Sequence, residues 1–470
     1  MFGLQWDWDA NQAARDNCAD RAQLSTPTMQ AQAKRAFGFN VIGYASGNLG
    51  LGVAARSLID LIIERGFAVS VYDLDPGVGR GGHERRFQRF IVEAIEDLPF
   101  AVNLFVLPPP TLAQLVPKHD KSLFRGDCIN VAVSFWELPV LPTKCIPTLD
   151  SMDVVVALSE SIRCAFQFTL SGPLIIGGLL PLQLPQGIKH DRERFGLPDD
   201  AVIFVMSFET NSDPQRKNPL AVVDAFLNGV GDDSRAHLVI KVNNPKTQAG
   251  EHSVLRELLT RCAGHPRIRI LTETLSYVDV LSLYASCDVY VSMHRAEGLG
   301  LGPMEAMALG KPVIATAWSG NMTYMNHTNA CLVSYRLVPV VGSIAEYSKS
   351  RLGDGAYWAE PSVSAAAAWM HRLMKDPVLR VQLGAQARED MARFETEAKG
   401  GRLLKELRTI WDNRSFLPAR IDQSARPRHL PELIAERDRR IRQLESELGS
   451  LTSKLSYRVA RAAKRFLTMS

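Results

Sequence analysis

Short apolar runs alternate with helical segments in two successive blocks of this chain, and this alternation limits the possible folds more than any other feature. In the first block the runs predict strands at 39–43, 70–72, 102–106, 129–135 and 154–158. Helices are predicted at 53–65 and, with Ser159 as the residue that caps its first turn, up to 168. Strands that alternate with helices form a parallel sheet with helices on both faces.

A second block of the same kind follows the stretch 179–185, which we expect to link two domains. Its strands are predicted at 202–206, 238–242, 268–271, 289–292, 313–316 and 331–334, and its helices near 219–228, 254–262 and 277–286. The pattern from 365 to about 411 is helical. The chain therefore predicts two α/β domains, with ligands at the carboxyl ends of the parallel strands.

The loop after the predicted strand 289–292 has the composition of a site for a phosphorylated sugar. It contains two carboxylates, Glu297 and Glu305, and between them Gly298, Gly300 and Gly302. Glycine lets a ligand approach the backbone closely, and the N–H groups at a helix start bind phosphate. Ionised carboxylates only accept hydrogen bonds, so they suit sugar hydroxyl groups. The combination predicts a site for a nucleotide sugar.

A short helix is predicted to begin where this loop ends. Pro303 suits the first helical position. Glu305 would then lie in the first turn, where the helix dipole favours a negative charge. Gly310 is predicted to end the helix.

The two glutamates resemble the Glu-x7-Glu signature of the retaining family 4 glycosyltransferases of GT-B fold, of the bacterial surface-polysaccharide type. By this resemblance Glu297 contacts the donor sugar and Glu305 contacts the nucleotide ribose. The backbone between them holds the diphosphate, which implicates Gly298, Gly300, Leu301 and Gly302. The resemblance also implies attack on the face of the sugar from which the leaving group departs. It further implies a late helix that crosses back onto the first domain.

A basic pair, Arg216 and Lys217, lies between the first strand of the second block and the next helix. A guanidinium binds phosphate as a fork and an ammonium binds it as a point charge, so the pair could neutralise a diphosphate. In the resembling family an Arg/Lys pair at this place does so. The family often has a further Gly-Arg upstream, where this chain has Ser207, Phe208 and Glu209. One expected cation is therefore missing or supplied elsewhere.

The loop after the first strand supports a different interpretation. Gly50, Gly52 and Ala55 fit G-x-G-x-x-A, and Asp73 follows about twenty residues later, which is the dinucleotide fingerprint. The main alternative is therefore an NAD-linked oxidoreductase, and a nucleotide-sugar epimerase or hydrolase on the same fold is another. In the resembling family this loop approaches the donor phosphate across the cleft. We assign that role to Gly50 and Gly52, because the oxidoreductase leaves the glutamates and the basic pair unexplained.

Three residues are candidates for the acceptor side of the cleft. Trp136 and Glu137 follow the predicted strand 129–135, where the indole could stack on a sugar and the carboxylate could accept its hydroxyl groups. His294 lies at the end of another strand, close to Glu297. Each has a structural alternative, in which Trp136 packs in a core and His294 is a hydrogen-bonded residue at a strand end. The histidine that the family often places after an early strand is missing from 103–110.

Composition excludes several other classes. The net charge of +4 is too small to indicate a nucleic-acid partner, and the seven cysteines form no C-x-x-C pair, so we expect reduced thiols and no zinc site. Asp73, Leu74 and Asp75 spell the Asp-x-Asp metal motif, but we interpret them as the end of a strand in the first domain. We therefore expect neither a metal nor a cofactor. The start of the chain is no secretory signal, and the apolar stretch 174–184 is interrupted by Gly and Pro, so we expect a cytoplasmic protein.

The C-terminal tail differs from the rest. After a Pro- and Arg-containing linker, apolar residues recur every seven positions at Ile434, Ile441, Leu448 and Leu455, and a basic amphipathic segment follows at 457–467. Residues 430–470 therefore predict self-association or a helix that lies on anionic lipid, with a solvated terminal helix as the alternative. A scaffold without catalytic activity, joined through this tail, is a more distant possibility.

The sequence thus predicts an α/β protein of GT-B fold, with two Rossmann-like domains that face a cleft and a C-terminal helical tail. The expected parts are an extension (1–36), an acceptor domain (37–183), a donor domain (184–395), a crossover helix (396–414) and the linker and tail (415–470). The expected activity is metal-independent, retaining hexosyl transfer from a UDP- or GDP-linked sugar to a glycan or lipid-linked glycan in polysaccharide biosynthesis. The expected place is the cytoplasm, with peripheral contact at the inner face of the plasma membrane.

Overall fold

The computed structural model describes residues 35–417, except 76, 78–83, 183, 244–252, 343–346, 349–351 and 353–354. Nearly all of the predicted extension and the whole of the segment 430–470 lie outside the described residues. The heptad and lipid-binding interpretations of the tail therefore stay predictions.

The first domain is, within the described residues, a six-stranded parallel sheet in the order β2-β1-β3-β4-β5-β6. Five strands confirm the predicted ones: β1 (Ala36–Gly43), β2 (Val69–Asp73), β3 (Phe100–Val106), β4 (Ile129–Val133) and β5 (Val154–Ala157). The sixth, β6 (Leu174–Gly177), was not predicted; it is a run of only four residues, preceded by Pro173 and followed by Gly178. The helices are α1 (Gly50–Glu64), α2 (Pro109–Leu115), α3 (Asp120–Leu123), α4 (Ile146–Asp150) and α5 (Glu160–Gln167). Ser159 caps α5 as predicted, since its Oγ accepts the Ile162 N–H.

The second domain has, in the part of the chain that is described, a parallel sheet in the order β12-β11-β10-β7-β8-β9. All of its strands confirm predicted ones: β7 (Val202–Glu209), β8 (Ala236–Asn243), β9 (Ile268–Leu271), β10 (Val289–Ser292), β11 (Val313–Thr316) and β12 (Cys331–Val333). The helices are α6 (Pro214–Lys217), α7 (Pro219–Val230), α8 (Ser253–Cys262), α9 (Tyr277–Ser286) and α10 (Leu301–Ala308), and a 3₁₀ turn, η8, spans Gly320–Thr323.

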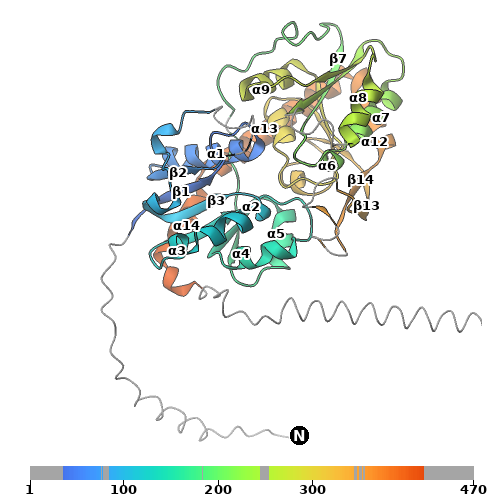
Figure 1. The fold of residues 1–470 in the computed structure, drawn as a ribbon. Helices are drawn as coiled ribbons and strands as arrows, with labels where there is room; N and C mark the ends of the chain where they lie inside the picture. The colour runs from blue at the N-terminus through green and yellow to red at the C-terminus, as the bar shows by residue number, and fades with distance from the viewer. Residues whose placement is uncertain are drawn as a thin grey trace, which may run out of the picture.

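The late helical region begins after a hairpin that the sequence did not predict. The antiparallel strands β13 (Tyr335–Pro339) and β14 (Tyr357–Pro361) lie between β12 and α12 (Val363–Lys375). Then come α13 (Pro377–Lys399) and α14 (Arg402–Asp412). Leu403, Leu404 and Leu407 of α14 share a core with first-domain residues such as Phe39, so the chain returns to the first domain (Figure 1).

The strand orders show where a ligand should bind. In the second sheet the order reverses between β7 and β10, and in the first sheet it reverses between β1 and β3. At such a point the loops that follow two neighbouring strands run to opposite faces of the sheet. A crevice forms between them at the carboxyl ends of the strands. In Figure 1 the two lobes lie side by side. The glutamate loop follows β10, the basic pair follows β7, and the Gly50 loop follows β1.

Gly310 ends α10 as predicted, in a Schellman motif. Its φ is 74°, its N–H donates to Met307 O (2.9 Å), and the Lys311 N–H donates to Ala306 O (2.9 Å). Gly384 of α13 packs on this turn, where a Cβ on Gly384 would lie 2.1 Å from Gly310 O. The absence of a side chain at Gly384 therefore lets α13 cover the end of α10.

Gly384→Ala should destabilise the protein. The added methyl group overlaps a backbone oxygen, and such overpacking costs about 1–3 kcal/mol, against a helix-propensity gain of about 1 kcal/mol. We expect a net decrease in the free energy of unfolding, measured by urea denaturation. Gly126→Ala is the control, because a Cβ at Gly126 meets no atom within 4 Å. Equal stability of the two variants would contradict the close packing of α13 on α10.

Candidate functional site

A cavity of about 590 Å³ lies between the two domains. Loops after β1, β3 and β4 form one wall, and loops after β7 and β10 form the other. The walls come close together at Gly50, where a Cβ would lie 3.5 Å from Leu301 Cδ1 of the opposite domain. The switch points of both sheets thus face the same cavity.

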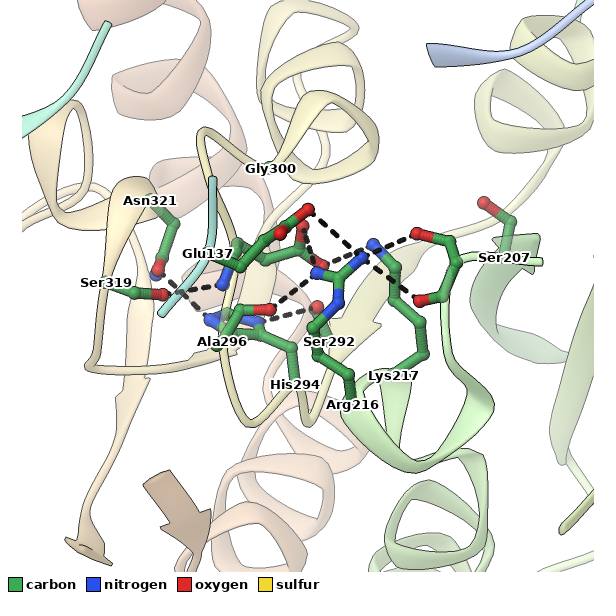
Figure 2. Close-up of polar contacts among 12 residues, drawn as sticks. Glu137, Ser207, Arg216, Lys217, Ser292, His294, Ala296, Gly300, Ser319 and Asn321 are labelled. Atoms are coloured by element: carbon green, nitrogen blue, oxygen red, sulfur yellow. Dashed lines mark hydrogen bonds and ion pairs between the residues drawn. The ribbon is translucent and has the colours of Figure 1, made fainter. Parts of the chain in front are cut away.

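Four charged side chains, contributed by both walls, lie close together in this cavity. Lys217 Nζ lies 2.5 Å from Glu297 Oε1, and Arg216 Nη1 lies 3.2 Å from Glu297 Oε2. Arg216 Nη2 also lies 3.6 Å from Oε1 of Glu137, which belongs to the first domain. In Figure 2 the Arg216 guanidinium points toward Glu137 and Ala296. The structure therefore brings the predicted basic pair and first glutamate together and adds Glu137, which the sequence had assigned to the acceptor side.

Arg216 is held firmly in this position. It is only 2% exposed, and it donates to Ala296 O (2.7 Å) and Ser212 Oγ (2.5 Å). The short helix α6 that carries it is flanked by Asp213 (φ 52°) and Asn218 (φ 55°), two non-glycine residues with positive φ. Such conformations persist where the surrounding structure enforces them, often at functional sites.

The hairpin β13–β14 braces the same region. Arg295 joins it to α6: the Arg295 N–H donates to Arg216 O (2.8 Å), and the Ala359 N–H of β14 donates to Arg295 O (2.9 Å). The Arg295 guanidinium forms two hydrogen bonds with Glu360 at 2.8 and 3.1 Å. The hairpin therefore fixes the start of the glutamate loop against α6.

Burial and neighbouring charges act in opposite directions on the pKa values of the cluster. Burial raises the pKa of Glu297, but Lys217 and Arg216 outweigh it and lower that pKa to about 2. Burial lowers the pKa of Lys217 despite the nearby Glu297. For Arg216 the effect of burial is reversed by Tyr347, Glu137 and Glu297, which raise its pKa above the usual value. Glu297 is thus ionised and Arg216 is cationic at neutral pH.

The helix after the glutamate loop begins earlier than predicted. Gly300 adopts a φ of 84° and serves as the N-cap, so Leu301 is the first helical residue. Pro303 is therefore the third helical residue, and the prediction that it takes the first position is wrong. The sequence could not show which of several glycines makes the left-handed turn. The helix start still faces the cavity, and Leu301 and Gly302 supply the first N–H groups, which have no acceptor within the helix.

Glu305 consequently lies beyond the first turn, and the expected stabilisation of its charge by the helix dipole is wrong. Its side chain is buried and lines the cavity. The Tyr277 hydroxyl donates to Glu305 Oε1 (3.0 Å). Burial raises the pKa of Glu305 to about 8, although the Tyr277 hydrogen bond lowers it. Without a ligand, Glu305 is therefore mostly protonated at neutral pH.

At each predicted glycine a different close contact limits the space for a side chain. A Cβ on Gly298 would lie 3.1 Å from Trp136 O, and one on Gly302 would lie 2.4 Å from Tyr290 Oη. Together with Gly50, Gly298, Gly300, Leu301 and Gly302 line the cavity. Gly52 is not among the described residues that line the cavity. It packs against the protein instead, since a Cβ on Gly52 would lie 2.3 Å from Gly47 O. The absence of a side chain at Gly52 therefore permits close packing against Gly47, and the expected donor contact of Gly52 stays a prediction.

The acceptor-side candidates separate into two groups. Trp136 and Glu137 line the cavity, with Trp136 only 3% exposed and its Nε1–H donating to Val140 O (2.8 Å). His294 is fully buried and is not one of the described lining residues, which favours the structural alternative of a hydrogen-bonded residue at a strand end. Its Nδ1 lies 2.9 Å from Ser292 Oγ, and its Nε2 lies 3.1 Å from Asn321 Oδ1. Burial lowers the pKa of His294, which is therefore a neutral, hydrogen-bonded residue beneath the glutamate loop.

Several residues of the site carried no recognisable signal in the sequence. The Tyr347 hydroxyl donates to Glu137 Oε2 (2.7 Å), and Tyr277 donates to Glu305. Ser207, where a further cation was expected, forms a hydroxyl cluster with Tyr284 and Tyr290. Each of these partners is separated from its contact by many residues of chain, and a lone tyrosine has no motif around it that could have indicated the contact.

The dinucleotide fingerprint is also placed by the structure. Asp73 Oδ1 accepts the Ser46 N–H (3.1 Å), and Arg56 donates to Ala45 O (3.0 Å) and Gly47 O (2.9 Å). These side chains stabilise the loop before α1 through hydrogen bonds to its backbone. Asp73 is therefore engaged with the protein at the place where the fingerprint requires an acid for a ribose.

Within the described residues, no group of three or more His, Cys, Asp or Glu side chains is arranged to hold a metal ion. The same part of the chain contains no helix that is long and apolar enough to cross a membrane.

Comparison with known proteins gives a family match for part of the second domain. Residues 200–346, which include α6 and α10, match the family model described as glycosyl transferases group 1. No curated protein matches the chain in sequence. The structure is similar to HepE from Anabaena, solved with UDP-glucose, with a TM-score of 0.56 and 15% identity over 79% of this chain and 99% of that chain.

Two further solved structures show the same likeness. Sucrose-phosphate synthase from Thermosynechococcus elongatus has a TM-score of 0.58 and 13% identity, covering 80% of this chain and 100% of that chain. Trehalose 6-phosphate synthase from Burkholderia multivorans has a TM-score of 0.56 and 10% identity, covering 81% of this chain and 98% of that chain. The chain has the GT-B fold, as predicted, and residues 200–346 of its second domain match the glycosyl transferases group 1 model.

The raised pKa of Glu305 predicts a pH-dependent stability of the unliganded protein. Between pH 4.5, the ordinary value of the group, and about 8, the folded protein holds a proton on Glu305 that the unfolded chain has lost. The free energy of unfolding should therefore fall as the pH rises through this window, by at most about 1.4 kcal/mol per pH unit. Glu305→Gln should remove this component.

Urea denaturation at several pH values between 5 and 8 would measure this pH dependence of the free energy of unfolding. Glu389→Gln is the matched control, because the Glu389 side chain is 65% exposed. The control should keep the pH dependence of the parent. A Glu305→Gln variant with the same dependence as the parent would contradict the protonation of Glu305.

Proposed function

We propose that this protein is a retaining glycosyltransferase that moves a hexose from a nucleotide-diphosphate sugar to a hydroxyl group of a glycan or lipid-linked glycan. The observation that carries the proposal is the buried cluster of Arg216, Lys217 and Glu297 beside the start of α10. It combines two cations, a hydroxyl acceptor and exposed helix N–H groups at a topological switch point.

The donor diphosphate would bind between the basic pair and the start of α10. Without a donor, Glu297 and Glu137 balance the charges of Lys217 and Arg216. A diphosphate brings negative charge of its own to the same cations. We propose that the Glu297 carboxylate then accepts hydrogen bonds from the hydroxyl groups of the donor sugar. Glu305 is proposed to accept hydrogen bonds from the ribose.

The chemical step would depend mainly on electrostatic stabilisation. As the bond between the sugar C1 and the phosphate oxygen breaks, negative charge grows on the diphosphate, and Arg216, Lys217 and the N–H groups of Leu301 and Gly302 stabilise it. The acceptor oxygen bonds to C1 on the same face, and its proton passes to the departing phosphate oxygen. Because these protein groups supply the positive charge, we propose that the reaction is independent of metal.

Trp136 and Glu137 are proposed to form part of the acceptor side. Both line the cavity from the first domain, and Glu137 reaches the cluster that binds the donor. A donor contact by Gly50 is supported by its place opposite Leu301. The likeness to HepE, which was solved with UDP-glucose, supports a UDP-linked donor, and GDP remains the alternative. A place in polysaccharide biosynthesis at the cytoplasmic face of the membrane follows from the sequence resemblance and the predicted tail.

Nucleotide binding tests the proposal directly. We expect UDP or GDP to raise the unfolding temperature of the purified protein, while NAD and NADP leave it unchanged. A ligand that binds only the folded state at about 100 times its Kd stabilises it by about 2.7 kcal/mol, which is readily detected. The increase should be smaller in Glu305→Gln. Stabilisation by NAD alone would favour the oxidoreductase and refute the glycosyltransferase.

Lys217→Ala should strongly slow release of the sugar from the nucleotide. Loss of one group that stabilises the developing charge costs about 2–4 kcal/mol in barrier, or about 30- to 1000-fold in rate. Release of nucleotide from the nucleotide sugar, followed over time, would measure it. Lys405→Ala is the control, since Lys405 is exposed on α14. If the two variants turn over equally fast, Lys217 has no part in the reaction.

A further inference from the structure

The backbone of Glu297 is held by the turn at residues 318–320. The Glu297 N–H donates to Ser319 Oγ (2.8 Å), and the Ser319 hydroxyl donates to Trp318 O (2.5 Å). The Gly320 N–H donates to Glu297 O (2.9 Å). Both polar groups of the Glu297 backbone are therefore bonded to two successive residues of this turn.

Ser319 has a backbone conformation that serine rarely adopts. Its φ is 73° and its ψ is −145°, close to a region that only glycine occupies readily. The turn approaches the glutamate loop so closely that a Cβ on Gly320 would lie 2.0 Å from Gly298 O. The close contact therefore requires glycine at position 320. Its neighbour Ser319, in contrast, has a side chain although its backbone conformation disfavours one.

The surroundings enforce this conformation. His294 Nε2 lies 3.2 Å from Trp318 O and 3.1 Å from Asn321 Oδ1. The Trp318 N–H donates to Thr316 O (2.8 Å), and Asn321 Nδ2 donates to the same oxygen (2.9 Å). Figure 2 shows Ser319, Asn321 and His294 gathered on one side of the glutamate loop. The buried histidine therefore holds the turn that holds Glu297.

We propose that Ser319 is a positioning residue for Glu297. By accepting the Glu297 N–H, its hydroxyl orients the backbone from which the carboxylate extends to Lys217 and Arg216. Glycine would relieve the strain but would leave this N–H without its acceptor. Ser319 is 9% exposed and is not among the described residues that line the cavity, so it acts through Glu297. This inference rests on the proposed function for its catalytic consequence.

Ser319→Gly and Ser319→Ala test the proposal together. Both remove the hydroxyl, but only glycine relieves the strain, so Ser319→Gly should unfold at a higher temperature than Ser319→Ala. Both should lower kcat by about tenfold or more, because small displacements of reacting groups are costly, with a smaller change in the donor KM. If the serine served stability alone, activity would follow the unfolding temperature, and Ser319→Gly would be as active as the parent.

Ser362→Gly is the matched control. Ser362 also accepts a backbone N–H, from Ala365 (3.2 Å), but its φ is −73°. This variant should keep the parental kcat and gain no stability. A Ser319→Gly variant with the parental kcat, or one less stable than Ser319→Ala, would overturn the proposal.

Amide hydrogen exchange at Glu297 gives a readout that does not depend on activity. Exchange should be faster in both Ser319 variants and unchanged in Ser362→Gly. Unchanged exchange in the Ser319 variants would refute the positioning role even if the parent is active. A parent that neither binds nor turns over a nucleotide sugar would refute the proposed function, while faster exchange in the variants would still support the role of Ser319 toward Glu297.

Discussion

The ion cluster of Arg216, Lys217, Glu297 and Glu137 is the interaction on which the rest of the site depends. Isolated charges are costly to bury, and these are tolerated because each has a partner at short distance. The partners come from both domains. The cluster therefore joins the domains across the cavity and at the same time presents two cations to it, which a diphosphate could use.

The two glutamates of the loop show how position alone separates two identical side chains. Glu297 lies beside two cations, and its pKa falls to about 2. Glu305 lies eight positions later in the chain, against Tyr277. Among the described residues it forms no salt bridge, and its pKa rises to about 8. One carboxyl group is ionised and the other holds a proton at neutral pH, so they can take different roles toward a single ligand.

Much of the fold followed from hydrophobic pattern. The strands of the second sheet and five of the first were predictable, because buried parallel strands are short, continuous apolar runs. The missed elements lack such a signal: β6 is four residues between glycines and prolines, and the hairpin β13–β14 is largely exposed on β13. The error at α10 had a similar cause, since the left-handed turn at Gly300 depends on how the loop packs.

The sequence by itself determined which chemical groups are available: two carboxylates spaced around a glycine loop, a basic pair, and two α/β blocks that bring them to strand ends. Only the tertiary structure decided how each group is used. It placed Glu137 beside Arg216, buried His294 beneath the loop, turned Gly52 inward and kept Ser319 in a strained turn. The physical reason is that charge, protonation and strain depend on neighbours in space, and these neighbours come from segments that are far apart in the chain.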